Sequence, residues 1–450
     1  MNADIARIIQ DFDLDEFRPI VPRELDLGEP LEPRVGNLAT VVMGVRRCGK
    51  TYRLFQEMDA LERAGVPVER ILYFNFEDDR LAPVTTRTGD EVLQTYFELH
   101  PESYSAGVYL FLDEIQEMEG WDVWLRRVID TTKATIYVSG SSSKLLSEEV
   151  ASAFRGRSIA YELSPYSFRE CLSLHEPEIS IGSGGAAQVF SSEEEARIRR
   201  CLEGYLELGG FPAVQGLTLQ RAVRVLQGYA QQVVAKDVLE RHNLGNPRAV
   251  SLFAQRLLAM SGRVLSIRKI ENSLRSQSVP VGRNLLSQAL GYFEDAFLVS
   301  TVGEFSRALS QTTSAMPKIY AVDPGLAMAN SPAASQDRGQ RLETVVYNEL
   351  RRRALDRTGS VSSYRTVHGG YEVDFVVGDA LSQEGFALYQ ASEDVREQRA
   401  RERELRALGA AMGELGLDEG FLLVLDGGRE DVSVDDGTVH QLPVWEWLLG

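Results

Sequence analysis

The sequence predicts an α/β protein whose first part is built around a doubly wound parallel sheet. Short apolar, β-branched segments predict strands at residues 38–43, 70–76, 107–112 and 134–139. Between them, apolar residues recur at helical spacing and predict helices near 51–64, 89–99 and 121–132. Strands that alternate with helices are typical of a parallel sheet, because parallel neighbours need a long crossover connection.

The loop after the first predicted strand carries a phosphate-binding motif. Residues 44–51 match G-x-x-x-x-G-K-S/T without a mismatch, and they lie between a strand and a helix as a P-loop does. The backbone N–H groups of such a loop and the next helix N-terminus favour a bound anion. We therefore expect ATP here, with Lys50 at the β- and γ-phosphates and Thr51 as a ligand of Mg²⁺. The residues expected at the nucleotide are Gly44, Val45, Arg46, Arg47, Cys48, Gly49, Lys50 and Thr51.

A pair of acidic residues ends the third predicted strand. The apolar run 108–112 is followed by Asp113 and Glu114. A Mg²⁺-dependent NTPase needs one carboxylate for the metal and its water shell and another to polarise the attacking water. Asp113 fits the metal role and Glu114 fits the role of catalytic base. This second acid favours hydrolysis of ATP over phosphorylation of a small molecule.

Composition narrows the class of protein. The length of 450 residues predicts two or three domains. No apolar run approaches the roughly 18 residues of a membrane span, and the N-terminus lacks a signal-peptide pattern. Three widely spaced cysteines fit a reducing compartment, so we expect a cytoplasmic protein without a membrane partner. The net charge of −18 predicts that any contact with DNA is local.

Residues 247–310 form a candidate DNA-binding segment. Predicted helices followed by β-prone residues give the order of a winged helix: 252–260, 267–274 and 284–296, then 297–300 and 318–322. The segment holds eight basic and four acidic residues, a local excess of positive charge. The residues expected at DNA are Arg268, Lys269, Arg275 and Arg283. A winged helix also serves as a lid or a protein-docking module, and the sequence leaves these alternatives open.

Several short strings occur together in a characteristic order. They are YFNFED (73–78), LDEIQ (112–116), SGSS (139–142), RGR (155–157), PYSFRE (165–170), GGFP (209–212), KDV (236–238) and EVDF (372–375). As a set, over about residues 36–448, they resemble the prokaryotic P-loop ATPases that have an AAA-type core and a C-terminal domain of the DUF4143 type. The resemblance implies an AAA-like ATPase, a winged-helix segment and a C-terminal domain related to restriction endonucleases.

The resemblance and the composition together predict the domain organisation. Pro, Gly and Ser content marks residues 177–196 as a mobile insertion or a linker, and Ala, Ser and Pro content marks residues 327–338 as a second linker. The expected parts are an N-terminal extension (1–37), an AAA-like core (38–165), a helical lid or connector (166–246), a winged-helix segment (247–326) and the DUF4143-type domain (339–450).

Further catalytic residues follow from the resemblance. The fourth predicted strand ends in polar residues beside the P-loop strand, where a side chain can sense the γ-phosphate or orient water. Ser141 is our first choice for this role and Ser139 the second. Arg155 or Arg157 is a candidate arginine finger, acting within the chain or from a neighbouring subunit of a homo-oligomer. Arg46 and Arg47 are expected to pack the loop or face phosphate rather than act as the finger.

The C-terminal domain is predicted to lack nuclease activity. Nucleases of this fold place an acid on one strand and E-x-K on the next to bind Mg²⁺ and activate water. Asp374 fills the first position, and Glu343 or Glu349 could supply a helix acid. Gln390 and Ser392 stand where the second acid and the lysine belong. An amide cannot supply an anionic metal ligand, so a scaffold or recognition role is expected.

The sequence is compatible with two functions. In the first, ATP hydrolysis drives a switch or motor that changes how the later domains engage a partner, either DNA or a protein. In the second, ATP is mainly a structural ligand of a regulatory scaffold with little turnover. The pair Asp113 and Glu114 favours the first function.

Overall fold

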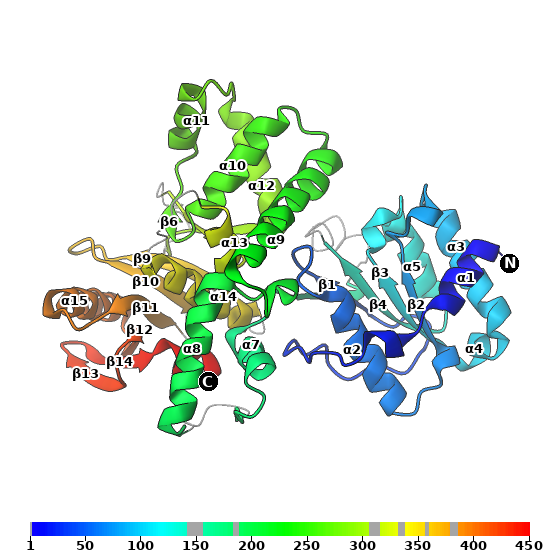
Figure 1. The fold of residues 1–450 in the computed structure, drawn as a ribbon, viewed down its shortest axis with the longest axis horizontal. Helices are drawn as coiled ribbons and strands as arrows, with labels where there is room; N and C mark the ends of the chain where they lie inside the picture. The colour runs from blue at the N-terminus through cyan, green and yellow to red at the C-terminus, as the bar shows by residue number, and fades with distance from the viewer. Residues whose placement is uncertain are drawn as a thin grey trace. The chain divides into compact units, whose positions relative to one another are not determined.

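The computed structural model describes residues 2–141, 156–182, 189–305, 316–331, 338–355, 360–378 and 386–450. These residues form two compact units. The first unit comprises Met1–Ser164 with Asp295–Phe297, and the second comprises Pro165–Glu294 with Leu298–Gly450. Figure 1 gives the labels of their helices and strands.

The first unit contains a parallel sheet with the order β2-β3-β4-β1-β5. Its strands are β1 (Ala39–Met43), β2 (Ile71–Asn75), β3 (Val108–Asp113), β4 (Ala134–Gly140) and β5 (Ser158–Glu162). The four strands predicted from the sequence are all found, and β3 and β4 are buried along their whole length. Because the strands are parallel, their carboxyl ends meet at one edge, which is where ligands bind in sheets of this kind.

Helices surround this sheet, and the N-terminal segment packs at its β2 edge. The helices are α1 (Ala3–Asp11), α2 (Lys50–Arg63), α3 (Thr86–Leu99), α4 (Pro101–Ala106) and α5 (Trp121–Thr131). Helix α1 contacts α3 and β2 (dark blue, Figure 1). The ring of Phe12 lies 4.5 Å from that of Tyr73, and Arg18 forms ion pairs with Asp59 and Glu62 of α2. Residues 2–37 are therefore packed into the first unit.

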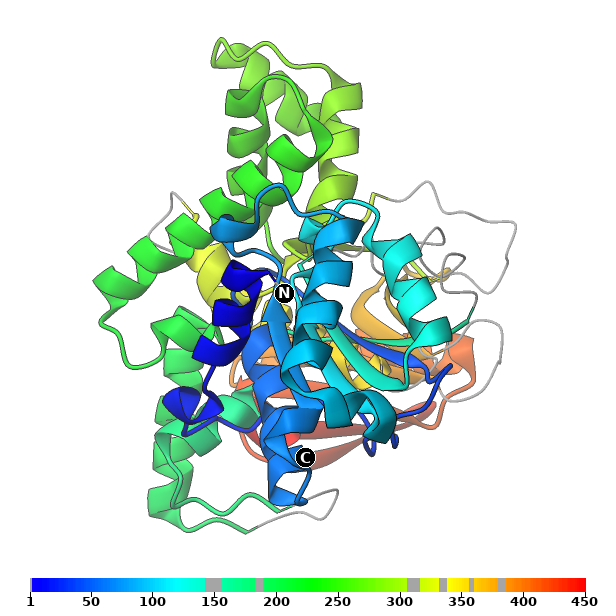
Figure 2. The ribbon, with the colours of Figure 1, turned by 90° about the vertical axis from the view of Figure 1, so that its right-hand side faces the viewer.

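The second unit begins with helices and a small antiparallel sheet. The helices are α7 (Phe168–His175), α8 (Ser192–Leu208), α9 (Leu219–Gln232), the π-helix η7 (Val233–Glu240), α10 (Pro247–Ala259), α11 (Ile267–Ser276) and α12 (Arg283–Asp295). The last three gather in one bundle in both views (green, Figures 1 and 2). Strands β6 (Arg263–Val264), β7 (Val299–Val302) and β8 (Lys318–Ala321) form a sheet with the order β6-β8-β7.

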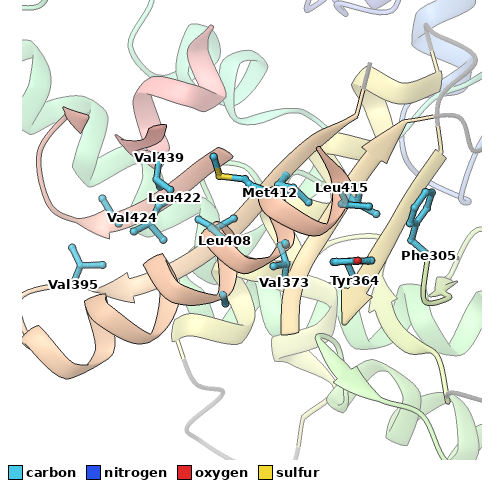
Figure 3. Close-up of a cluster of buried hydrophobic side chains, with 14 residues drawn as sticks. Phe305, Tyr364, Val373, Val395, Leu408, Met412, Leu415, Leu422, Val424 and Val439 are labelled. Atoms are coloured by element: carbon cyan, nitrogen blue, oxygen red, sulfur yellow. The ribbon is translucent and has the colours of Figure 1, made fainter. Parts of the chain in front are cut away.

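A six-stranded mixed sheet completes the second unit. Its order is β13-β14-β12-β11-β10-β9, and the strands are β9 (Ser360–Arg365), β10 (Glu372–Gly378), β11 (Ala387–Asp394), β12 (Glu419–Asp426), β13 (Glu430–Val434) and β14 (Gly437–Pro443). Helix α15 (Gln398–Leu415) packs its apolar side on this sheet, where Leu408 and Met412 meet Val373, Leu422 and Val439 in a buried core (Figure 3).

The other face of this sheet is covered by further helices. Phe375 and Tyr389 point away from α15, because side chains alternate along a strand. Their rings contact Tyr347 of α14 (Arg338–Leu355) and Trp447 of α16 (Val444–Leu449), respectively. The central strands of the sheet thus lie between two layers of helices.

Two segments predicted as linkers contain helix. Residues 192–196 begin α8, where Ser191 and Glu194 form a capping box, so the acidic residues 193–195 belong to the first turn of a helix. Residues 327–329 belong to α13 (Pro324–Ala329), which starts with Pro324 and is capped by the buried Asp323. Ala327 and Ala329 are buried in the second unit, whereas residues 332–337 of this predicted linker lie outside the described residues.

Candidate functional site

The P-loop follows β1 and begins α2, as the motif predicts. A Cβ atom on Gly44 would lie 2.0 Å from the carbonyl oxygen of Leu163, so only glycine fits there. Gly49 has φ 104°, a left-handed conformation that glycine adopts without strain. Cys48 is buried, and burial raises the pKa of its thiol, which disfavours the reactive thiolate. The loop is thus held in shape by packing and by its glycines.

The side chain of Lys50 folds back onto the backbone of the P-loop in this structure. Its side chain is buried, and Nζ donates to the carbonyl oxygens of Gly44 at 3.1 Å and Val45 at 3.4 Å. The same ammonium lies 3.9 Å from a carboxylate oxygen of Glu114. The structure therefore brings the predicted phosphate ligand and the predicted base together.

Asp113 is the centre of a buried hydrogen-bond network at the carboxyl end of β3. Its carboxylate accepts from Thr51 Oγ1 at 2.7 Å, from the Tyr73 hydroxyl at 2.9 Å and from the Ser139 hydroxyl. Burial, followed by the charge of Glu114, raises the pKa of Asp113, whereas these three hydrogen bonds lower it. Thr51 and Asp113 offer hard oxygen ligands at adjoining positions, which suits Mg²⁺ held by few protein groups together with phosphate oxygens.

Glu114 is positioned by strained backbone and by a neighbouring amide. It has φ 50°, which is uncommon for a residue other than glycine, and its side chain is largely buried. Its N–H donates to Ser139 Oγ at 3.3 Å, and Nε2 of Gln116 donates to its carboxylate. Gln116 lies in η4 (Ile115–Glu117), and its Nε2 is 3.5 Å from Oγ of the buried Ser141. Ser141 therefore reaches Glu114 through Gln116, whereas Ser139 contacts Asp113 directly.

The two P-loop arginines differ in their surroundings. Arg46 is buried, and its Nη1 lies 2.9 Å from Oε1 of Glu77, which follows β2. Arg47 is exposed and has φ 72°. Arg46 is thus the one that extends across the carboxyl edge of the sheet.

Only one of the two candidate arginine fingers lies within the described residues. Arg155 lies outside the described residues. Arg157 precedes β5, and its carbonyl oxygen accepts from the N–H of Ala39 at the start of β1. It therefore lies at the amino edge of the sheet, opposite the P-loop, where it pairs with Asp130. The structure does not bring Arg157 to the site of its own chain, and a finger from a neighbouring copy stays a prediction.

The basic residues predicted at DNA are all exposed. Arg268 and Lys269 lie in the first turn of α11. Arg275 pairs with the buried Glu271 at 2.9 Å and donates to the carbonyl of Val281 at 3.0 Å, and Arg283 lies 3.7 Å from Glu271. Part of the predicted positive patch is therefore neutralised within the segment.

The C-terminal acids surround a lysine that the sequence reading missed. Nζ of Lys318, on β8, lies 3.0 Å from Glu343, 2.9 Å from Glu372 and 3.1 Å from Asp374. Burial raises the pKa of Glu343 to about 7. The Lys318 ammonium thus lies among acids that the sequence suggested for a metal site, and among the described residues no group of three or more His, Cys, Asp or Glu is suited to a metal ion.

The other residues of the proposed nuclease position have structural partners. Gln390 accepts from the N–H of Asp374 at 3.0 Å and donates to Glu404 at 2.9 Å. Glu349 is buried and forms ion pairs with Arg352 and Arg353. Ser392 is half-buried on β11.

Replacing Lys318 by methionine should destabilise the protein by about 3–5 kcal/mol, because buried carboxylates would lose their cation. The urea midpoint of unfolding measures this change. Lys236→Ala, which removes an exposed lysine of the same unit, is the control and should change stability little. Combining Lys318→Met with Asp374→Asn should recover part of the loss. A loss below about 1 kcal/mol for Lys318→Met would contradict the inferred role of this cation.

Comparisons with known proteins agree with the geometry of the first unit. Residues 36–172 match the model of an AAA domain family (AAA_14), so the chain contains an AAA-type P-loop ATPase domain. Residues 199–337 match a domain of unknown function, DUF8612. The DUF4143-type domain that the resemblance suggested for residues 339–450 stays a prediction. None of the helices in the described parts of the chain is long and apolar enough to cross a membrane.

Relatives of this chain extend over most of its length. An uncharacterised protein of Methanocaldococcus jannaschii is 29% identical over 449 residues, covering 98% of this chain and 94% of the relative. An uncharacterised protein of Haemophilus influenzae is 27% identical, covering 81% of this chain and 85% of the relative. A Walker-type ATPase of Pyrococcus abyssi, whose structure is known, has 15% identity and a TM-score of 0.43, covering 71% of this chain and 99% of that one.

Proposed function

We propose that this protein is a Mg²⁺-dependent ATPase that works as a nucleotide-driven switch or motor. The observation that carries the proposal is the buried network at the carboxyl edge of the first sheet. Thr51 and Asp113 are joined by a 2.7 Å hydrogen bond, and the carboxylate of Glu114 lies 3.9 Å from the ammonium of Lys50. A metal ligand pair, a phosphate ligand and a base therefore surround the place expected for the terminal phosphate.

The proposed reaction uses each of these groups in one role. Lys50 binds the β- and γ-phosphates, and Thr51 with Asp113 would hold Mg²⁺. The ion would neutralise charge on the phosphate oxygens. Glu114 accepts a proton from the attacking water. Ser139 donates to the carboxylate of Asp113 and accepts from the N–H of Glu114, so it holds both residues in position. Ser141 acts through Gln116 on the orientation of Glu114.

A second candidate is an ATP-binding scaffold with little turnover. One observation favours it: the carboxylate of Glu114 is engaged by Gln116 and faces Lys50 in this structure, so the base is not free. Steady-state release of phosphate from MgATP, measured with and without duplex DNA, separates the two. Sustained release that depends on Glu114 supports the switch or motor. Tight ATP binding without sustained release in either condition supports the scaffold.

The helical part of the second unit is proposed to be a winged helix that contacts DNA. Its order is α10, β6, α11, α12, β7, β8, with the sheet order β6-β8-β7, as in winged helices. Arg268 and Lys269 are exposed and supply positive charge in a chain with net charge −18. The six-stranded sheet after it is proposed to be a nuclease-like scaffold whose cation position is taken by Lys318.

Replacing Arg268 and Lys269 by glutamate should weaken duplex binding and reduce the salt slope of log affinity by about 2, because each phosphate contact contributes about 0.9. Basal ATP hydrolysis should not change. Arg221→Glu with Arg224→Glu, two exposed residues of α9, is the matched control because it changes the net charge equally. The proposal fails if the wild-type protein binds no duplex at low salt, or if both double variants weaken binding to the same degree.

A further inference from the structure

One P-loop side chain extends along the carboxyl ends of the strands, from the end of β1 toward the end of β2. Arg46 follows β1, and its guanidinium lies 2.9 Å from the carboxylate of Glu77, which follows β2. In the order β2-β3-β4-β1, the ends of β4 and β3 lie between those two positions. These are the ends that carry Ser139, Asp113 and Glu114. The pair of Arg46 and Glu77 therefore spans the catalytic network.

The position of Glu77 is fixed next to the predicted metal ligand. The N–H of Phe76 donates to the carbonyl oxygen of Asp113 at 3.0 Å, and the N–H of Glu77 donates to the side chain of Asn75 at 2.8 Å. The chain after β2 thus continues alongside the end of β3. A guanidinium bound to Glu77 accordingly lies on the side of the P-loop that faces Asp113 and Glu114.

The two partners differ in their freedom to move. The side chain of Arg46 is 6% exposed, whereas that of Glu77 is 36% exposed. Glu77 therefore has solvent beside it into which it can turn, while Arg46 is enclosed by its surroundings. A γ-phosphoryl group carries more negative charge than one carboxylate, and guanidinium groups bind phosphate oxygens with two parallel hydrogen bonds. ATP should therefore displace Glu77 and keep Arg46.

We propose that Arg46 is the arginine of this ATPase that contacts the γ-phosphoryl group, acting within its own chain, and that Glu77 holds it ready when no nucleotide is bound. The inference rests on the proposed ATPase function. Water attacks the γ-phosphorus, Glu114 takes its proton, and the bond from the γ-phosphorus to the β–γ bridging oxygen breaks to give ADP and phosphate. Arg46 donates to a γ-oxygen and stabilises the charge that develops there.

The test compares Arg46→Ala, Arg46→Lys and Glu77→Gln in the full chain. Arg46→Ala should lower kcat by about 10³-fold, weaken binding of ATP, and leave affinity for ADP within about threefold of wild type, since ADP lacks the γ-group. Arg46→Lys should recover only a small part of kcat, because an ammonium cannot form the two parallel bonds. Glu77→Gln should tighten binding of ATP but not of ADP. Arg87→Ala, at an exposed arginine of α3, is the control.

Three results would overturn the inference. One is a kcat of Arg46→Ala within about threefold of wild type. Another is an equal loss of ATP and ADP affinity, which would mean that Arg46 only packs the loop. A third is recovery of activity on mixing Arg46→Ala with Lys50→Ala chains, which would mean that the arginine acts from a neighbouring copy. If wild type itself hydrolyses no ATP, the proposed ATPase fails, and the ratio of ATP to ADP affinity still tests the contact of Arg46.

Discussion

Replacing Lys50 by alanine is expected to lower the affinity for ATP by about 100-fold or more, equivalent to about 3 kcal/mol. The ammonium is buried in the P-loop, where it donates to the carbonyl oxygens of Gly44 and Val45 and lies 3.9 Å from Glu114. With ATP bound, these donors are expected to turn to the β- and γ-phosphates, and charge-assisted bonds of this kind are the strong ones. Alanine removes them without replacing the charge.

Calorimetric titration with MgATP measures this loss directly. Lys133→Ala removes an exposed lysine from the same unit and should leave affinity unchanged. Circular dichroism should show that Lys50→Ala retains the fold of wild type, because the backbone of the loop is held by its own packing. An affinity equal to that of wild type would contradict the P-loop assignment.

Replacing Glu114 by glutamine is expected to lower kcat by about 100-fold while ATP affinity stays within a few-fold of wild type. General bases typically contribute factors of this size. An amide has the shape of the carboxylate but cannot accept the proton of the attacking water. The substitution therefore removes the proposed chemical step and keeps the nucleotide site.

A nearby residue provides a matched control for this variant. Glu119 is exposed after η4, and Glu119→Gln makes the same chemical change away from Asp113 and Glu114. Its kcat should equal that of wild type. Hydrolysis by Glu114→Gln at the wild-type rate would show that another residue is the base.

The first unit could be predicted from sequence because its signals are local. Each of its four predicted strands is a short apolar run, which is the pattern typical of parallel strands that are buried on both faces. The glycines of residues 44–51 allow the backbone conformation of a P-loop, so the shape of this loop can be predicted from the motif alone. Asp113 and Glu114, the carboxylates proposed as metal ligand and base, stand where a predicted strand ends, and their place at the carboxyl edge follows from the parallel topology.

The contacts that tune this site could not be predicted, because they join residues far apart in the chain. Tyr73 reaches Asp113 from β2, and Arg46 reaches Glu77 across the sheet. Gln116 belongs to the string LDEIQ, but nothing in the string says that its amide bridges Glu114 and Ser141. Sequence spacing could not decide between the roles of Ser139 and Ser141 for the same reason.

The second unit was harder to predict for two physical reasons. Strands β9 and β13 are partly exposed and mix polar with apolar residues, so they lack a continuous apolar run. The motif of a nuclease-like site places its lysine at position 392 on β11, where this chain has Ser392. The lysine that contacts Asp374 is instead Lys318 on β8, 56 residues earlier in the chain. Such a replacement depends on the packing of two sheets, which no local pattern records.

Release of phosphate from MgATP by the wild-type protein, compared with Lys50→Ala and Glu114→Gln and repeated with the metal chelated, tests the central claim most directly. The account predicts sustained release by wild type, loss of release on chelation, and a loss of at least about tenfold in each variant. Release that continues at the wild-type rate in both variants, or no release by wild type in the presence or absence of DNA, would contradict it.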